Sequence, residues 1–184
     1  MYMKPYIELS ESEYTDAVMK AQKGFSMKKI KIVGENYIGK WEKARTACRG
    51  IVTDGGRILL VCEPGIEEYM IPGGGLEKGE SDNECCVREI AEETGVLVEP
   101  SDCLLEIDEY YGNDKFVNKY FLCRPVGTTE MHLTEAEQKL GMEPRWLSIS
   151  EAQSIFSNYQ SYAESNEERC GLYLREHQVL IHIF

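Results

Sequence analysis

The sequence lacks any run of about 18 apolar residues, the length needed to span a bilayer, and its first residues carry no apolar stretch of signal-peptide length. It also lacks internal repeats and low-complexity segments, which excludes solenoids, rods and arrays. Its 184 residues suffice for one ordinary domain and are too few for two full-sized ones. We therefore predict a folded cytoplasmic protein without a membrane segment.

Cysteine pairs with the spacing of a zinc site are also missing. The seven cysteines are an odd number and include no Cys-x-x-Cys pair and no histidine partner at zinc spacing. Reduced, mostly buried thiols fit this pattern better than a disulfide framework does.

Positive charge is scarce as well, because 20 Lys and Arg residues stand against 32 Asp and Glu residues, for a net charge of −12. A surface that binds long nucleic acids needs many cationic contacts to phosphate, so we expect no such partner. An acidic protein that handles phosphates needs a metal cation instead. A phosphate substrate would therefore require a site for such a cation in this chain.

The order of the expected elements, strands then helix then strands then helix, predicts an α+β sandwich rather than regular βαβ repeats. We divide the chain into an N-terminal extension at 1–46, a central domain at 47–160 and a C-terminal helical segment at 161–184 that packs on the domain. Strands are expected at 29–33, 48–53, 57–62, 69–71, 96–98, 104–111, 115–124 and 144–147, with hairpin turns at 54–56 and 112–114. Helices are expected at 11–23, 82–94, 150–159 and 164–176, and a long polar loop at 127–141.

The helix at 82–94 carries its start and stop signals in the sequence. Ser81 precedes it as N-cap, Glu84 completes a capping box, and Gly95 is placed to close its C-terminus. The glycine run at 73–75 is expected to be a turn that lets a phosphate or a metal approach the backbone. Ser150 is the expected N-cap of the later helix.

Three glutamates of the helix at 82–94 share one face. At about 100° per residue, Glu92 falls about 60° to one side of Glu89 and Glu93 about 40° to the other. Like charges at this spacing repel each other and cost a helix roughly a few tenths of a kcal/mol per pair. The cluster is either a solvated acidic face softened by Arg88 or a site for a cation such as Mg²⁺, which prefers carboxylate and carbonyl oxygens.

The run Gly74-x5-Glu80-x7-Arg88-Glu89-Ile90-Ala91-Glu92-Glu93-Thr94-Gly95-Val96 resembles the signature of the Nudix hydrolases at every specified position. A looser resemblance extends over about 48–152. The resemblance implies an α/β/α sandwich with a mixed sheet and a loop–helix–loop that binds Mg²⁺ or Mn²⁺. It also implies hydrolysis of a small phosphorylated substrate, a nucleoside diphosphate linked to another group.

Carried over by position, the resemblance implies metal binding by Glu89, Glu92, Glu93 and the carbonyl of Gly74. One of these glutamates is then a candidate base for the attacking water. The implied catalytic set is Glu92, Glu89 and Arg88.

The resemblance also implies structural roles within the motif. Glu80 is similar to the residue that pairs with Arg88 to brace the loop, and Gly95 ends the helix. In this family a further base can lie outside the motif, in a loop after the later strands. The candidates for it are Glu130, Glu135 and Glu137.

Two other functions remain open for the same fold: a nucleotide-sensing domain that is catalytically silent, and an enzyme that acts on the 5′ pyrophosphate of RNA. The complete glutamate set counts against the first, and the acidic surface counts against the second. Nucleotides, nucleotide sugars and ADP-ribose are all open as substrates. Residues 1–46 are expected to cover the pocket or to form a homodimer contact.

Several other residues have a structural reading that outweighs a functional one. Cys85 lies among the glutamates, but a small side chain packed beneath the loop is expected rather than a metal ligand. The aromatic residues at 110, 111, 116 and 120 are expected in the core or in cross-strand pairs rather than stacked on a base. His132 receives no role.

Overall fold

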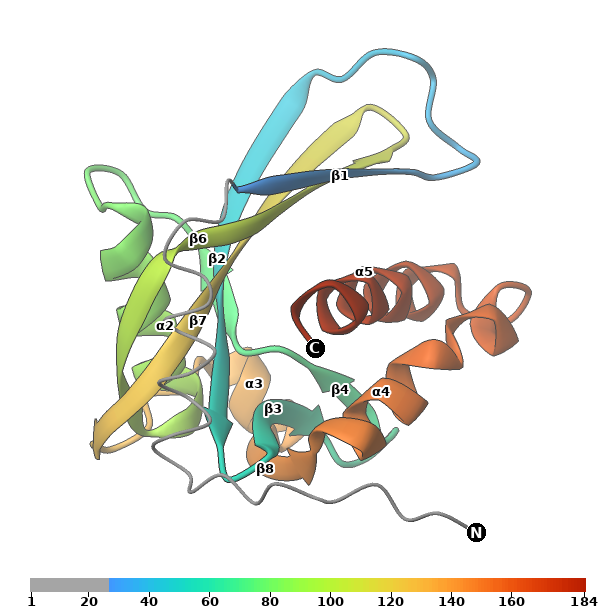
Figure 1. Ribbon diagram of the computed structural model, residues 1–184. Helices are drawn as coiled ribbons and strands as arrows, with labels where there is room; N and C mark the ends of the chain where they lie inside the picture. The colour runs from blue at the N-terminus through green and yellow to red at the C-terminus, as the bar shows by residue number, and fades with distance from the viewer. Residues whose placement is uncertain (1–26) are drawn as a thin grey trace, which may run out of the picture.

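The strands of residues 27–184, the part of the chain that this computed structural model describes, form a mixed eight-stranded sheet (Figure 1). Its hydrogen-bonded order is β1-β6-β7-β2-β3-β4, with β5 paired to β2 and β8 paired to β3. The strands are β1 (Lys28–Val33), β2 (Lys43–Asp54), β3 (Arg57–Glu63), β4 (Glu68–Met70), β5 (Gly73–Gly75), β6 (Val96–Tyr111), β7 (Asp114–Thr128) and β8 (Glu143–Ser148). The helix expected at 11–23 lies outside the described residues.

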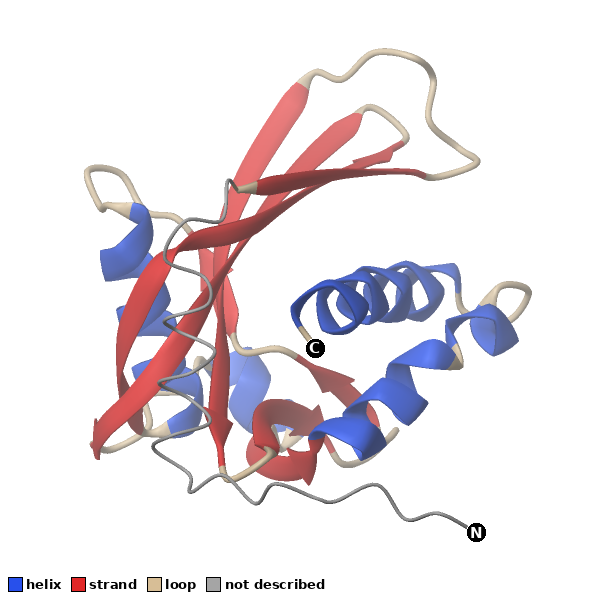
Figure 2. Ribbon diagram, viewed as in Figure 1, coloured by secondary structure: helices blue, strands red, loops and turns tan. Residues whose placement is uncertain are grey.

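Helices cover both faces of this sheet (Figure 2). α2 (Asp82–Thr94) packs against β2 and β6 on one side, and α5 (Glu167–Ile183) lies on the other side with α4 (Ile149–Ser157). The described residues also form α3 (Glu135–Leu140) and the 3-10 turn η1 (Tyr159–Tyr162). The sequence prediction of a sandwich with a mixed sheet is confirmed, while its division into 1–46, 47–160 and 161–184 stays a prediction. Within residues 27–184, no helix is both long and apolar enough to cross a bilayer.

The sheet bends at the first hairpin. Its turn is where the sequence predicts it, with Gly55 and Gly56 at φ angles of 55° and 75° that glycine adopts without a Cβ clash. β2 and β3 pair next to this turn, at Thr53–Ile58 and Asp54–Arg57. β2 then runs parallel to β7, whereas β3 pairs with β4 and β8. The two halves of the sheet therefore diverge and enclose the core.

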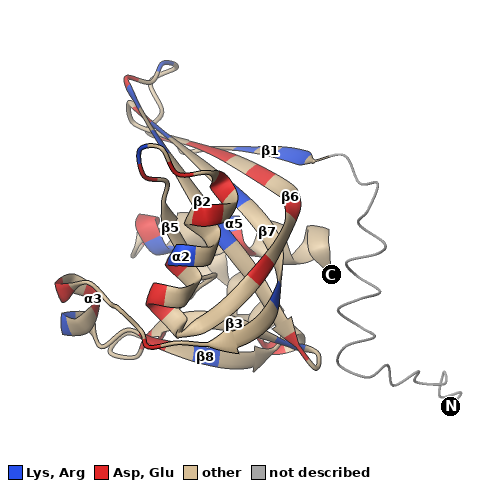
Figure 3. Cartoon of the chain, turned by 90° about the vertical axis from the view of Figure 1, so that its left-hand side faces the viewer, with Lys and Arg blue, Asp and Glu red and all other residues tan. Residues whose placement is uncertain are grey.

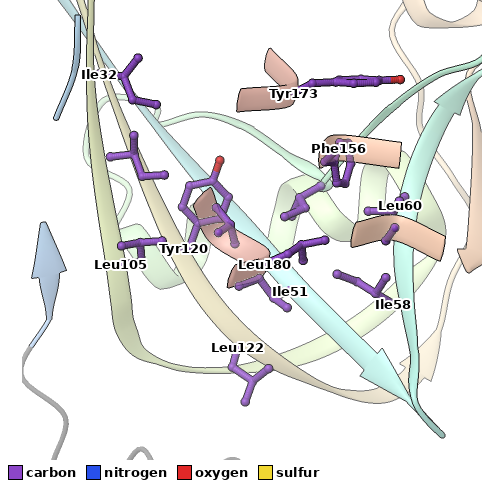
Figure 4. Packing of buried hydrophobic residues seen from close by; sticks show 14 residues of the cluster. Ile32, Ile51, Ile58, Leu60, Leu105, Tyr120, Leu122, Phe156, Tyr173 and Leu180 are labelled. Atoms are coloured by element: carbon purple, nitrogen blue, oxygen red, sulfur yellow. The ribbon is translucent and has the colours of Figure 1, made fainter. Parts of the chain in front are cut away.

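The main core lies between the diverging halves of the sheet and the helices α4 and α5. Phe156 meets Tyr173 edge to face, with ring centroids 5.2 Å apart. The buried residues of this main core include Ile32, Ile51, Ile58, Leu60, Leu105, Tyr120, Leu122, Phe156, Tyr173 and Leu180 (Figure 4). A second cluster, which contains Cys86, Ile90 and Cys123, lies beneath α2. All seven cysteines lie within the described residues as free thiols, and five are buried, as the sequence predicts.

The prediction of a glycine turn at 73–75 is wrong. These residues form β5, which pairs antiparallel with residues 47–49 of β2. The alternation of side chains that identifies a strand is missing from three glycines, so the sequence pattern does not reveal it. The pairing places this backbone in the sheet beside β2, where it contacts α2.

The prediction of a long loop at 127–141 is wrong over most of its length. β7 continues to Thr128, and α3 begins after Thr134, which forms a capping box with Glu137. The N-cap of α4 is Ser148 rather than Ser150, because Glu151 stands three residues after Ser148 and completes the box there. The last helix runs over 167–183 rather than 164–176, and the strands expected at 96–98 and 104–111 are one irregular strand.

The boundaries of α2 agree with the sequence prediction. The Ser81 side chain accepts a hydrogen bond from the Glu84 backbone, and the Glu84 side chain accepts one from the Ser81 backbone. Gly95 ends the helix in the left-handed conformation with φ 69°. Both ends of the helix that carries the glutamates are therefore fixed by local hydrogen bonds.

The distance between α2 and β2 is set by Gly50, because a Cβ there would lie 2.0 Å from Cδ1 of Ile90. We expect Gly50→Ala to lower the free energy of unfolding by about 1–3 kcal/mol through overpacking. Ile90→Val removes the clashing Cδ1 and by itself costs about 0.5–1.5 kcal/mol. In urea unfolding, the loss in free energy of unfolding of the double variant should therefore be smaller than the sum of the losses of the two single variants. Strict additivity would show that this contact does not set the spacing.

Candidate active site

Three glutamates of α2 lie together on one face of the helix. The helical wheel places Glu89, Glu92 and Glu93 on one face, and acidic residues of α2 are visible on this side of the molecule in Figure 3. The side chain of Glu89 is 15% exposed and that of Glu92 is 40% exposed. The Glu89 carboxylate is thus sheltered, whereas that of Glu92 is more accessible to solvent.

The backbone of β5 lies directly against this face. A Cβ on Gly74 would stand 2.4 Å from Oε2 of Glu89, so only glycine permits the observed approach. The backbone N–H of Gly73 donates a hydrogen bond of 2.8 Å to Oε2 of Glu93. Cys85, which the sequence places beneath the loop, is buried there, and its thiol donates to the carbonyl oxygen of Gly74 over 3.6 Å. The glycine strand and two of the glutamates therefore form one unit.

Arg88 connects this unit to the loop that precedes α2. Its Nε and Nη2 donate to the two carboxylate oxygens of Glu80 at 2.8 and 2.9 Å, and Nη2 also donates to the carbonyl oxygen of Gly75 at 3.1 Å. These hydrogen bonds lower the pKa of Glu80 to about 2. The paired charges hold the loop of residues 76–81 against the helix.

The same guanidinium also lies between two of the clustered glutamates. Nη1 of Arg88 donates to Glu89 at 2.8 Å and to Glu92 at 3.2 Å. Arg88 thus offsets the repulsion between these carboxylates, which would otherwise destabilise the helix. Its single positive charge is shared by three acidic side chains, those of Glu80, Glu89 and Glu92.

Burial dominates the electrostatics of the two inner glutamates. It raises the pKa of Glu93 to about 7, against the hydrogen bond from Gly73 and the charge of Arg49, which lower it. Burial likewise raises the pKa of Glu89, although Arg88 opposes the shift. Excess negative charge is therefore costly here, and a cation held by these oxygens would relieve that cost.

Among the three candidates outside the motif, Glu137 acts electrostatically on the cluster. Its charge raises the pKa of both Glu89 and Glu93. In α3 the Glu137 carboxylate accepts hydrogen bonds from the backbone N–H and the hydroxyl of Thr134. The segment before α3 is tied to α2, because the His132 N–H donates to the carbonyl oxygen of Glu92.

The donor set fits a hard divalent cation. Carboxylate and backbone carbonyl oxygens are the ligands that Mg²⁺ takes, and Gly74 leaves open the space that a Cβ would fill beside Glu89. Within residues 27–184, no three His, Cys, Asp or Glu side chains already converge at metal-binding distance. Arg88 holds Glu89 and Glu92 instead, so binding a metal requires these two side chains to turn from the guanidinium.

Sequence reasoning missed Arg49, which lies on the opposite side of β5. Nη1 of Arg49 donates to the carbonyl oxygens of Ile71 and Gly73 at 3.1 and 3.2 Å, and Nε donates to Oδ1 of Asn118 at 3.1 Å. Nothing in the spacing of the motif marks Arg49 or Asn118. A polar pair on facing strands becomes visible only when the pairing of β2 with β7 is known.

A cavity of about 710 Å³ lies on the face of the sheet that α5 covers. Its walls include Met70, Glu109, Tyr111, Phe116, Leu172 and Arg175. Of the four aromatic residues expected in the core or in cross-strand pairs, Tyr120 is fully buried, and the ring of Tyr110 is tilted against that of Tyr37 with centroids 5.2 Å apart. Tyr111 and Phe116 line the cavity, and they lie opposite Asp114 and Glu109 in the pairing of β6 with β7, which confirms the expected cross-strand pairs for these two.

Comparison with known proteins assigns this arrangement to a family. A family model described as the NUDIX domain matches residues 43–167. The chain belongs to the Nudix family. The matched residues contain β2 to α4, and with them α2, β5 and every glutamate of the cluster. Nudix hydrolases generally use divalent metal ions.

A relative in Bacillus subtilis (strain 168), named "Putative ADP-ribose pyrophosphatase YjhB", is 35% identical to this Nudix chain over 88 residues. The matched segment covers 47% of this chain and 42% of the relative, so the chain spans less than half of that protein. A Nudix hydrolase structure from Nitrosomonas europaea has a TM-score of 0.54 at 20% identity and covers 74% of this chain and 89% of that one. This likeness supports the Nudix fold.

A MutT Nudix hydrolase structure from Burkholderia pseudomallei is similar over 59% of this chain and 86% of its own. It has a TM-score of 0.47 at 24% identity.

The raised pKa of Glu93 predicts how the stability of the metal-free protein depends on pH. Between about pH 4.5 and pH 7 the unfolded chain has released this proton while the folded chain still holds it, so stability falls as pH rises through this window. We expect Glu93→Gln to remove up to about 3 kcal/mol of this decline. Urea unfolding in EDTA from pH 5 to pH 8 measures the difference. Parallel curves for the two proteins would contradict the prediction.

Proposed function

We propose that the chain is a metal-dependent Nudix pyrophosphohydrolase that cleaves the anhydride bond of a nucleoside diphosphate linked to another group. The observation that carries the proposal is the contact between β5 and α2, where Gly73 and Gly74 meet Glu93 and Glu89. It brings the glycine backbone against two of the carboxylates, and backbone carbonyl and carboxylate oxygens are the ligands that Mg²⁺ takes.

Glu89, Glu92 and Glu93, with the carbonyl oxygen of Gly74, are the proposed ligands of Mg²⁺, for which Mn²⁺ can substitute. When bound, the metal neutralises phosphate oxygens and lowers the pKa of a coordinated water. One of these glutamates is also the candidate base for the attacking water, and of them Glu89 is sheltered whereas Glu92 is more exposed to solvent. Arg88 is proposed to act indirectly by holding the loop of residues 76–81 through Glu80.

The substrate class is proposed from the family and from the cavity under α5. Its volume of about 710 Å³ suits a small organic group, and its walls combine aromatic, apolar and charged side chains. Glu109 lines this cavity and connects through Asn118 to Arg49, which binds the backbone beside Gly74. The name of the Bacillus subtilis relative makes ADP-ribose one member of the class to test.

A screen with Mg²⁺ identifies the substrate within this class. Nucleoside triphosphates, nucleotide sugars, ADP-ribose and dinucleoside polyphosphates are each incubated with the protein, and phosphate is read after coupling to a phosphatase. Calorimetry run beside it distinguishes an enzyme from a nucleotide sensor. Tight binding of a nucleotide without product after long incubation would overturn the proposed activity.

Removing one charge from the cluster tests the assigned ligands. We expect Glu92→Gln and Glu93→Gln each to lower kcat by about 100-fold, because each loses an anionic oxygen that the metal needs. Glu84→Gln is the matched control on the same helix. A glutamine there keeps the capping box with Ser81 and should leave kcat unchanged. Unchanged turnover in the Glu92 or Glu93 variant would refute the assignment.

A second series distinguishes the three candidate bases outside the motif. Because the charge of Glu137 acts on Glu89 and Glu93, we expect Glu137→Gln to lower kcat by about 100-fold with little change in KM. Glutamine can still complete the capping box with Thr134, so α3 should remain folded. Glu130→Gln and Glu135→Gln serve as comparisons and should retain turnover. A larger loss in either of them would transfer the role to that residue.

A further inference from the structure

A chain of buried polar side chains crosses the sheet on the face opposite to α2. It starts at Arg49, whose Nε donates to Oδ1 of Asn118 at 3.1 Å. Nδ2 of Asn118 donates to Oε2 of Glu109 at 2.7 Å, and the same oxygen accepts from Nη1 of Arg175 at 3.2 Å. Arg175 also donates to Glu176 at 2.8 Å. The chain thus connects β2, β7, β6 and α5.

These groups are deeply enclosed. Glu109 and Asn118 are each 3% exposed, Arg175 is 8% exposed, and Glu176 is fully buried. Removing charges from water costs several kcal/mol per ion, and well-packed apolar side chains often give equal or greater stability. Stability alone therefore does not account for placing this chain in an otherwise apolar core. Its direction, toward the glycine strand, indicates a positioning task.

The end of the chain fixes the backbone on both sides of Pro72. Nη1 of Arg49 donates to the carbonyl oxygens of Ile71 and Gly73, so one nitrogen holds two peptide groups. Gly73 itself has φ 140°, and a Cβ there would lie 2.2 Å from the carbonyl oxygen of Cys48. Glycine can adopt many backbone conformations, so its own preferences do not select this one. A contact from outside the strand must therefore hold it. Its orientation determines where the Gly73 N–H and the Gly74 carbonyl point.

Asn118 is suited to its place because a neutral amide donates at one end and accepts at the other. Its oxygen faces the cationic Arg49 and its nitrogen faces the acidic Glu109. Aspartate would oppose Glu109 with a second negative charge, and leucine would break both hydrogen bonds. The amide therefore transmits the orientation of Glu109, held by α5, to the guanidinium of Arg49.

We propose that Asn118 and Glu109 are positioning residues which, through Arg49, hold the backbone of residues 71–74 in the orientation that metal binding requires. The inference rests on the proposed function in taking the Gly74 carbonyl and the glutamates of α2 as the metal site. It adds that the core beneath α5 sets the affinity of that site. The relay comprises Arg49, Asn118, Glu109 and Arg175.

Titration with Mn²⁺, followed through the electron paramagnetic resonance signal of the free ion and without substrate, tests the relay. We expect Asn118→Leu to raise the Kd for Mn²⁺ by about tenfold, a typical effect of removing a group that orients a ligand. In Mg²⁺-supported hydrolysis, the Mg²⁺ concentration at half-maximal rate should rise by a similar factor. The rate at saturating Mg²⁺ should return to that of the wild type, which a loss of folded protein would not allow.

Tyr120→Phe is the matched control. Tyr120 is fully buried on the same strand and donates to Glu176 at 3.2 Å, but it makes no hydrogen bond to Arg49 or Asn118. This variant should bind Mn²⁺ as the wild type does. Should Asn118→Leu fail to fold, Arg49→Lys makes the same test, because lysine keeps the charge but lacks the planar guanidinium whose two nitrogens reach the carbonyls and Asn118 from separate positions.

The outcomes separate the relay from the function on which it rests. A folded Asn118→Leu protein with the wild-type Kd overturns the relay alone, and so does an equal loss of affinity in Tyr120→Phe. Absence of Mn²⁺ binding by the wild type overturns the proposed metal site together with the relay. A tenfold weaker site in Asn118→Leu or Arg49→Lys, with Tyr120→Phe unchanged, supports it.

Discussion

The close approach of the glycine backbone of β5 to α2 is the constraint on which the site depends. Gly74 admits the Glu89 carboxylate to a position that any Cβ would occupy, and Gly73 donates its N–H to Glu93. The approach requires α2 to dock tightly on β2, which Gly50 permits by leaving room for Ile90. Glycines of two strands, Gly50 in β2 and Gly73 and Gly74 in β5, therefore permit the short distance between α2 and the backbone beside it.

This tight docking brings acidic groups together, and the surrounding cations limit its cost. Arg88 donates to Glu80, Glu89 and Glu92, while the charge of Arg49 lowers the pKa of Glu93 against the effect of burial. The cations are outnumbered by the carboxylates, so the cluster keeps an excess of negative charge at neutral pH. A divalent cation bound by these oxygens would offset this excess of negative charge.

The sequence predicted those parts of the fold and the site whose signals are local. Ser81, Glu84 and Gly95 define α2 because capping chemistry acts within one helical turn. The same chemistry would have corrected the start of α4, where Ser148 and Glu151 form the box. β5 escaped prediction because glycines carry no side-chain pattern, and Asn118 and Glu109 escaped because their partners come from other strands and from α5. Long-range contacts of this kind require the topology.

The net charge of −12 is not spread evenly over the protein, because some regions are neutral and others carry an excess of negative charge. Beneath α5, the charges of Arg49 and Arg175 balance those of Glu109 and Glu176, so these four side chains contribute no net charge. At the cluster, the single charge of Arg88 is shared among Glu80, Glu89 and Glu92, and a polyphosphate approaching these side chains alone would be repelled. The formal charge counts both regions alike, although only the second carries an excess of negative charge. Under the proposed function, a divalent cation held by the cluster would supply the attraction for phosphates, so the geometry of the Gly73–Gly74 backbone would matter for substrate binding as well as for chemistry.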